Sequence, residues 1–270
     1  MPEFIDICEQ AAKAGGQALL DWRGRFQARL KGPGDLVSEA DLASQAAIRA
    51  VVLGAYPQHA FLGEEETAED RIANAIISSL RGDFEYRWIV DPLDGTTNYV
   101  HGLAHYSVSV ALEHRGRVIA GTVYDPETGE VFSAAAGAGA TLNGAQIRVS
   151  DCRELGDALV AASFAASVGR ETLEVRQFLE MLEVCQALRR MGSAALNLAY
   201  VACGRLDAYW SLTCKAWDIA AGVLLVEEAG GVVTSATGGP LSLAQPQFAV
   251  ASTRPLHAEL ISRIARAGNS

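Results

Sequence analysis

The chain has 270 residues, of which 50% are hydrophobic and 20% are charged, so it can bury a large apolar core. It shows no Gly-X-Y or heptad repeat and no apolar run of roughly 18 residues, which excludes a collagen, a coiled coil and a membrane-spanning helix. Its 22 basic and 32 acidic residues give a net charge of −10. Such a chain does not hold nucleic acid by overall charge, so we expect no direct nucleic-acid partner. Because it has no apolar run of membrane-spanning length, we also expect no membrane partner.

The cysteines and the first residues bear on the compartment. The five cysteines are far apart, and no two have Cys-x-x-Cys spacing, which favours free thiols over a disulfide framework. The first residues show no basic stretch followed by an apolar one, as a secretion signal would. We therefore expect a cytoplasmic protein.

The first part of the chain is predicted to be helical. Apolar residues recur every three or four positions from about Glu3 to Leu30, which is the period of an amphipathic helix. The Lys-Gly-Pro-Gly-Asp stretch at 31–35 breaks this pattern. A second helix is expected from Ser38 to Leu53, because Ser38 with an acidic residue three positions later is typical of a capping box.

Strands are predicted next. They are expected at 88–90, 106–112, 117–124 and 130–134. The turn-rich residues 125–129 between the last two predict a hairpin, and Asn143-Gly144 predicts another tight turn.

The remainder alternates between helical and strand patterns. Helices are expected at 170–190, 193–203, 216–229 and 255–267, and strands at 158–164, 206–211 and 247–252. The fold class is therefore α/β, with an α+β first half and an α/β second half. We expect two subdomains, 1–143 and 144–270, which share a ligand-binding cleft.

An acidic motif follows the strand predicted at 88–90. Asp91 and Asp94 are three positions apart, Pro92 fixes the backbone and Gly95 permits close approach. Carboxylates and a backbone carbonyl are hard oxygen ligands for Mg²⁺ or Mn²⁺, and the Thr96 hydroxyl can orient a water. On these residues alone, a capped turn with incidental acids is the alternative, because Asp, Pro, Gly and Thr are common turn residues.

Two further acidic segments strengthen the metal interpretation. Glu64 follows an apolar pair, and Asp218 comes directly after Trp217 at the start of a predicted helix. Each has a simpler alternative when taken alone, because a run of Glu is often a solvated helix start and a lone Asp is often a helix cap.

Together these segments closely resemble the signatures of the inositol monophosphatase family, which are magnesium-dependent, lithium-sensitive phosphatases. The signatures occur in the family's order as Gly63-Glu64-Glu65, Asp91-Pro92-Leu93-Asp94-Gly95-Thr96-Thr97-Asn98 and Trp217-Asp218-Ile219-Ala220-Ala221-Gly222. Residues 35–41 and 190–195 also match, so the resemblance runs nearly end to end. It implies a layered αβαβα sandwich of the inositol monophosphatase and fructose-1,6-bisphosphatase type, usually dimeric, with metals between its halves.

The resemblance also implies the metal ligands. Glu64, Asp91 and the Leu93 carbonyl would hold one Mg²⁺, and Asp91, Asp94 and Asp218 would hold a second. A third, looser ion would lie near Glu64, and Mn²⁺ can substitute. In two-metal hydrolysis one ion lowers the pKa of a water and the other stabilises the leaving oxygen.

The remaining site residues follow from the same resemblance. Thr96, hydrogen-bonded to Asp41, and Glu64 would orient and deprotonate the attacking water. Lys31 would lie on a mobile flap over the metals, with a solvated loop lysine as the alternative. The residues expected to contact the substrate are Asp94, Gly95, Thr96, Gly192, Ser193, Ala194, Ser211 and Asp218.

One position departs from the family. Inositol-specific members have a Glu seven residues before the position of Asp218, where this chain has Ser211. A serine is shorter and neutral, so a charge-assisted contact to the polyol is weakened or lost. We therefore expect a phosphatase of small polyol or sugar monophosphates, of the inositol 1-phosphate type, with a broad or shifted preference.

Two alternatives to this function stay open. One is the same chemistry on 3′-phosphoadenosine 5′-phosphate, fructose 1,6-bisphosphate, NADP or histidinol phosphate. The other is a mainly protein-binding role in transcription or ribosome assembly.

Overall fold

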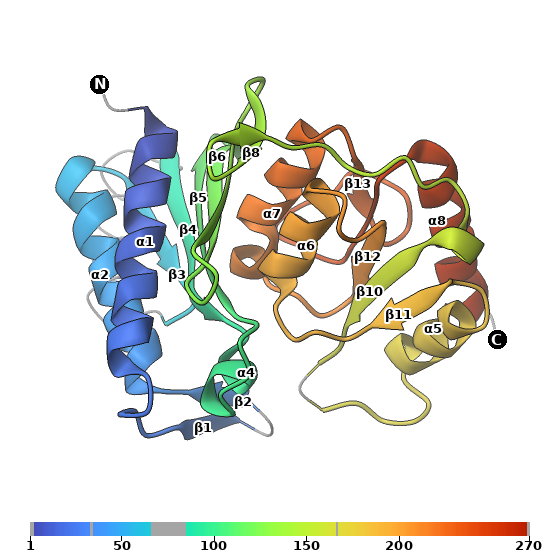
Figure 1. Cartoon of the computed structure of the whole chain (residues 1–270), viewed down its shortest axis with the longest axis horizontal. Coiled ribbons are helices and arrows are strands. Elements are labelled where there is room, and N and C mark those ends of the chain that lie inside the picture. The colour runs from blue at the N-terminus through green and yellow to red at the C-terminus, as the bar shows by residue number, and fades with distance from the viewer. Residues whose placement is uncertain (1–2, 33–34, 66–84, 166, 269–270) are drawn as a thin grey trace.

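The computed structural model describes residues 3–32, 35–65, 85–165 and 167–268 (Figure 1). In this part of the chain, helices and sheets alternate in five layers, from α1 and α2 on one outer face to α5 and α8 on the other. The expected αβαβα sandwich is therefore confirmed. None of the described helices is both long and apolar enough to cross a membrane.

The first outer layer consists of α1 (Phe4–Trp22) and α2 (Glu39–Ala55). The predicted capping box of α2 is confirmed, because the Ser38 hydroxyl accepts from the Ala40 N–H and Asp41 accepts from the Ser38 N–H. The expectation that the first helix extends to Leu30 is wrong. The chain leaves the helix after Trp22, Gly24 adopts a φ of 71°, and β1 (Arg29–Gly32) pairs with β2 (Asp35–Val37) instead.

The first large sheet has the order β3-β4-β5-β6-β7-β8-β9 among the described strands. Its strands are β3 (Ala60–Gly63), β4 (Tyr86–Asp94), β5 (Ser107–His114), β6 (Arg117–Asp125), β7 (Glu130–Ala135), β8 (Gly139–Leu142) and β9 (Ala145–Gln146). β3 runs parallel to β4, and every later neighbour is antiparallel. Both predicted turns are confirmed. The expected division at 143/144 falls in the β8–β9 turn, within this sheet, and stays a prediction.

The middle layer consists of α6 (Ala194–Ala202) and α7 (Ala216–Glu228). Two glycines let these helices approach their neighbours closely. A Cβ on Gly121 of β6 would lie 2.9 Å from the Ala221 Cα, and a Cβ on Gly222 would lie 2.5 Å from the Leu198 Cβ. The middle helices therefore lie directly against the sheet and against each other.

The second large sheet has the order β11-β10-β12-β14-β13, and α5 and α8 cover its outer face. The elements of this half are η1 (Leu155–Asp157), β10 (Leu159–Ser163), α5 (Leu173–Leu182), β11 (Ala187–Arg189), β12 (Ala208–Ser211), β13 (Val232–Ser235), β14 (Phe248–Ala251) and α8 (Arg254–Gly268). The helix expected at 170–190 is shorter than predicted, because residues 187–189 form an edge strand that pairs with β10.

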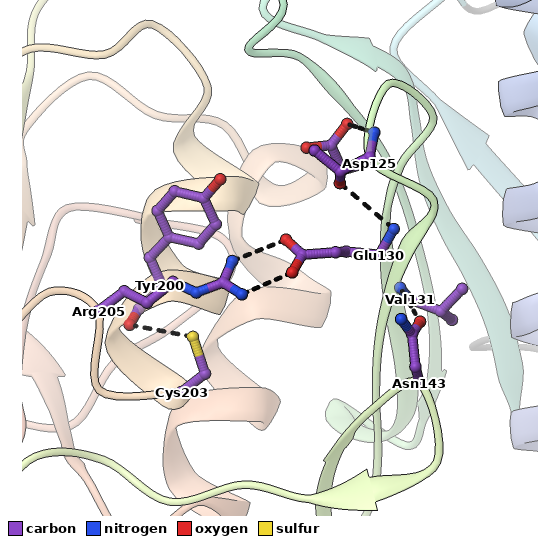
Figure 2. A network of polar contacts seen from close by, with 8 residues as sticks. Asp125, Glu130, Val131, Asn143, Tyr200, Cys203 and Arg205 are labelled. Atoms are coloured by element: carbon purple, nitrogen blue, oxygen red, sulfur yellow. Dashed lines mark hydrogen bonds and ion pairs between the residues drawn. The ribbon is translucent and has the colours of Figure 1, made fainter.

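An ion pair joins the middle layer to the first sheet (Figure 2). Arg205, which follows α6, donates to both carboxylate oxygens of Glu130 on β7, at 2.7 and 2.5 Å. Its guanidinium also lies 5.2 Å from the ring centre of Tyr200 and 5.9 Å from that of Phe132. The planar fork of arginine suits this combination of two parallel hydrogen bonds and aromatic contacts.

Candidate active site

A β-bulge places the two acids of the 91–98 motif. Residues three apart on a regular strand point to opposite faces of a sheet. In β4, however, Asp91 is opposite Ser109 and Asp94 is opposite Ser107, so β4 contains one residue more than β5 over this stretch. The extra residue returns both carboxylates to the same face, which is the usual effect of a bulge beside a functional site.

Glu64 reaches the same region through the parallel pairing of β3 with β4. Gly63 is in register with Val90, and the Glu64 N–H donates to the Val90 carbonyl at 3.1 Å, which continues the pairing to the edge where Asp91 begins the motif. Gln45 of α2 holds the next residue, since its side chain bonds both the N–H and the carbonyl of Glu65. The backbone around Glu64 is thus fixed from two sides.

The middle helices hold the other two acids at their N-termini. The Oδ2 of Asp94 accepts from the Ser193 hydroxyl at 2.5 Å and from the Ala195 N–H at 2.7 Å, at the start of α6. The Oδ2 of Asp218, in the first turn of α7, accepts from the Lys215 N–H at 2.8 Å. A helix N-terminus favours negative charge, so both carboxylates lie where the backbone supports them.

Neighbouring carboxylates affect the ionisation of Asp91 and Asp218. Burial raises the pKa of Asp91 well above its ordinary value, and the charges of Glu64, Asp94 and Asp218 raise it further. Burial likewise raises the pKa of Asp94 to about 6 and, together with the charge of Asp94, that of Asp218 to about 8. Burial and the nearby negative charges mean that the site favours either protons or a cation among these oxygens.

The donor chemistry fits a divalent cation, but a complete set of ligands is not preassembled. Within the described residues, no three acidic, histidine or cysteine side chains are grouped closely enough to hold one ion together. Glu64 and Asp94 are near enough to raise the pKa of Asp91 and of Asp218, and carboxylates are the oxygen ligands that Mg²⁺ and Mn²⁺ take. The fit therefore rests on the kind of donors and their charge.

Thr96 and Asp41 meet as expected. The Thr96 hydroxyl lies 3.3 Å from the Asp41 Oδ1 and 3.1 Å from the Leu93 carbonyl oxygen. Asp41 is fully buried, and its Oδ2 accepts from the Ser38 hydroxyl at 2.6 Å. The helix cap of α2 therefore orients the carboxylate that faces Thr96.

Apart from Asp94 and Asp218, which are described above, the residues expected to contact substrate lie at three places in the fold. Gly95 and Thr96 lie at the start of α4 (Thr96–Val100). Gly192 lies directly before the start of α6, where Ser193 is the N-cap and Ala194 the first helical residue.

Ser211 is completely buried at the end of β12, where its hydroxyl oxygen accepts from the Thr213 N–H at 3.2 Å and lies 3.2 Å from the Cys214 sulfur. The backbone of Lys31 lies on β1, but its side chain is outside the described residues.

Several residues that shape the site were not predicted. Ser44 donates to the Pro92 carbonyl at 2.7 Å, Ser107 lies 3.2 Å from Ser193, and Ser109 donates to the Trp217 carbonyl at 3.2 Å. A signal was available for α2, because Ser44 shares the buried face of the helix with apolar residues, where a polar side chain requires a partner. For Ser107 and Ser109 of β5, we found no sequence pattern that predicts a contact with the site.

Comparison with known proteins gives a consistent result. The model of the inositol monophosphatase family matches residues 1–269. An inositol-1-monophosphatase of Rhizobium meliloti is 41% identical over 244 residues, which cover 87% of this chain and 86% of the relative. Nus factor SuhB of Pasteurella multocida is 38% identical over 269 residues, which cover 98% and 96%.

Solved structures agree with these sequence relatives. The extragenic suppressor protein suhB of Bartonella henselae superposes with a TM-score of 0.87 at 35% identity, covering 97% of this chain and 98% of its own. The inositol monophosphatase of Anabaena superposes with a TM-score of 0.83 at 37% identity, covering 97% and 95%. Family model, sequence relatives and structures all extend over nearly the whole chain, which therefore belongs to the inositol monophosphatase family.

Proposed function

We propose that this chain is a Mg²⁺-dependent phosphatase that hydrolyses a phosphate monoester of a small polyol or sugar, of the inositol 1-phosphate type. The observation that carries the proposal is the burial of Asp91 and Asp218, whose pKa values are raised by that burial and by the charges of Glu64 and Asp94. Burying like charges together is costly unless a proton or a cation offsets them. The family membership supports phosphate ester hydrolysis as the use of such a cation.

The expected ligands divide between two ions. Glu64, Asp91 and the Leu93 carbonyl would hold one, and Asp91, Asp94 and Asp218 would hold the second, with a third, looser ion near Glu64. A bound Mg²⁺, or Mn²⁺ in its place, lowers the pKa of a water and offsets the charge of the phosphate. Without such cations, a chain with a net charge of −10 would repel its substrate.

The chain's own side chains would orient the water. The single hydroxyl hydrogen of Thr96 is directed toward the Asp41 carboxylate or the Leu93 carbonyl, so its oxygen lone pairs can accept a hydrogen bond from water. Glu64 would accept the proton as the water attacks phosphorus. No covalent phosphoenzyme is needed for this reaction.

The substrate would be contacted by the remaining predicted residues. We assign Asp94, Gly95 and Thr96, the turn at 192–194 and Asp218 to the phosphate and the adjoining hydroxyls. Ser211 offers no charge to a polyol, and its hydroxyl is already shared with Thr213 and Cys214. We therefore propose a broad or shifted preference among polyol and sugar phosphates.

The test is phosphate release by the purified protein, with and without Mg²⁺. The panel contains inositol 1-phosphate, glycerol 2-phosphate, fructose 1,6-bisphosphate, 3′-phosphoadenosine 5′-phosphate, NADP and histidinol phosphate. Asp94→Asn tests the site, and Asp151→Asn is the matched control, because Asp151 is exposed on a loop outside the site. We expect Mg²⁺-dependent release that Asp94→Asn abolishes and Asp151→Asn leaves unchanged. Release from none of the substrates, or equal release by Asp94→Asn, would overturn the proposal.

A second candidate function is a protein-binding role in transcription. It is favoured by one observation, that a relative matching 98% of this chain is named Nus factor SuhB. Asp94→Asn distinguishes the two when it replaces the wild-type gene in cells. If the enzyme is what the cell requires, the variant loses its biological function together with phosphatase activity, whereas a binding role survives the substitution.

We also propose that the chain acts as a cytoplasmic homodimer. Light scattering of the purified protein tests the oligomeric state, and a mass near the 28.6 kDa of one chain would contradict the dimer.

A further inference from the structure

The side chain of Asn98 joins two separate stretches of backbone. Its Nδ2 donates to the carbonyl oxygen of His105 and to that of Met191, each at 2.7 Å. The backbone carbonyl of Asn98 accepts from the Leu103 N–H at 2.9 Å. Asn98 thus connects α4 both to the loop that follows it and to the segment that enters α6.

The backbone next to the Asn98 side-chain amide is that of a glycine, Gly192. Gly192 has a φ of 96°, a conformation that favours glycine, and a Cβ at this position would lie 2.7 Å from the Asn98 Nδ2 and 3.1 Å from its Oδ1. Asn98 therefore packs directly against the Cα of Gly192, where a Cβ would displace the amide. The contact fixes the direction of the chain just before Ser193.

The same turn then holds Asp94. The Ser193 hydroxyl and the Ala195 N–H both donate to the Oδ2 of Asp94. Asp94 and Asn98 are four residues apart on one continuous segment, so this segment contacts the start of α6 at two points. At one point a carboxylate accepts from N–H and O–H groups, and at the other an amide donates to carbonyl groups.

We propose that Asn98 is a positioning residue. By holding the carbonyl of Met191 it fixes the turn that leads into α6, and through Ser193 and Ala195 it fixes the orientation of the Asp94 carboxylate. The consequence for metal binding rests on the proposed function, because Asp94 is there assigned as a ligand. The consequence for the turn does not depend on that function.

Two variants and one control isolate the effect. Asn98→Asp keeps the size of the side chain, removes both donated hydrogens and places a negative charge against two carbonyl oxygens. Asn98→Ala removes the hydrogen bonds without adding charge, and serves if the first variant does not fold. The control is Gln177→Glu in the outer layer, where a buried amide donates to the Ile264 carbonyl at 3.3 Å and accepts from the Trp210 indole at 3.1 Å.

The first measurement is hydrogen exchange of the Ala195 amide in metal-free protein. We expect exchange to accelerate by about tenfold or more in both Asn98 variants, since a donor held by the turn is released. Gln177→Glu should leave it unchanged under conditions where circular dichroism shows all variants folded. Wild-type protection of Ala195 in both Asn98 variants would overturn the proposal.

The second measurement is Mn²⁺ binding, followed by electron paramagnetic resonance without substrate. Loss of a residue that orients a ligand typically weakens metal binding by about 10- to 100-fold, so the Kd of the Asn98 variants should rise while that of Gln177→Glu stays at the wild-type value. Raised Mg²⁺ should then restore kcat in the Asn98 variants. A Kd equal to that of the control would overturn the metal-positioning role. If wild type itself binds no Mn²⁺ and releases no phosphate, the proposed function fails, and the exchange of Ala195 still decides whether Asn98 holds the turn.

Discussion

Gly222→Ala in the middle of α7 sets two effects of opposite sign against each other. Alanine is favoured over glycine inside a helix by about 1 kcal/mol, which alone would stabilise the protein. The new Cβ, however, would lie 2.5 Å from the Cβ and 2.6 Å from the Cδ1 of Leu198 on α6. The Leu198 Cβ is attached to the backbone and cannot rotate away, so the two helices must move apart.

Overpacking of this kind costs about 1–3 kcal/mol and, where backbone has to shift, lies at the upper end of that range. The net expectation for Gly222→Ala is therefore a loss of about 1–2 kcal/mol in the free energy of unfolding. The matched control is Gly54→Ala near the end of α2, where nothing lies within 4 Å of the added Cβ and where a gain of up to about 1 kcal/mol is expected. Urea unfolding of both variants measures the difference. A Gly222→Ala protein as stable as wild type, or more stable, would refute the argument from close helix packing.

Three further predictions concern the site and the ion pair. Burial raises the pKa of Asp218 to about 8, so this carboxyl binds its proton more tightly when folded and its contribution to stability is lost as the pH rises toward 8. In EDTA, Asp218→Asn should therefore gain stability relative to wild type between pH 5 and pH 8.5, and urea unfolding that shows the same difference at both pH values would contradict this. Arg205→Lys should lose the paired hydrogen bonds to Glu130 and lower the free energy of unfolding by about 1 kcal/mol or less, because the pair is partly exposed; stability equal to wild type at low salt would count against it. Gly95→Ala should cost about 1–2 kcal/mol, because Gly95 has a φ of 99° and an added Cβ would lie 3.1 Å from a carbonyl oxygen; thermal unfolding at the wild-type temperature would exclude this strain.

Local sequence signals predicted much of the fold. The start of α2 follows from Ser38 and Asp41, which lie within one helical turn. The Ser38 side chain accepts from backbone N–H groups of that turn, and the Asp41 side chain accepts from the Ser38 N–H. The β6–β7 hairpin follows from a turn-rich pentapeptide between two alternating runs. Both signals act over a few residues, so they need no knowledge of the rest of the chain.

Features that depend on distant partners were not predictable in this way. The bulge that turns Asp91 and Asp94 to one face is set by the register with β5, and the edge strand at 187–189 exists because β10 offers it a partner. The role of Asn98 depends on Met191, which is 93 residues away in the sequence. The four acids of the candidate site were identified from residue type and family resemblance, and the hydrogen bonds that orient them required the structure.

The placement of α6 and α7 between the two sheets has a consequence for how the protein is made. The ribosome completes the first sheet at Gln146, but the helices that cover its second face end only at Glu228, about 80 residues later. Protein synthesis proceeds at about 5–20 residues per second, so one apolar face of the first sheet stays uncovered by α6 and α7 for roughly 4–16 s. Nascent chains stalled in this interval should therefore recruit chaperones or aggregate more readily than chains released beyond α7.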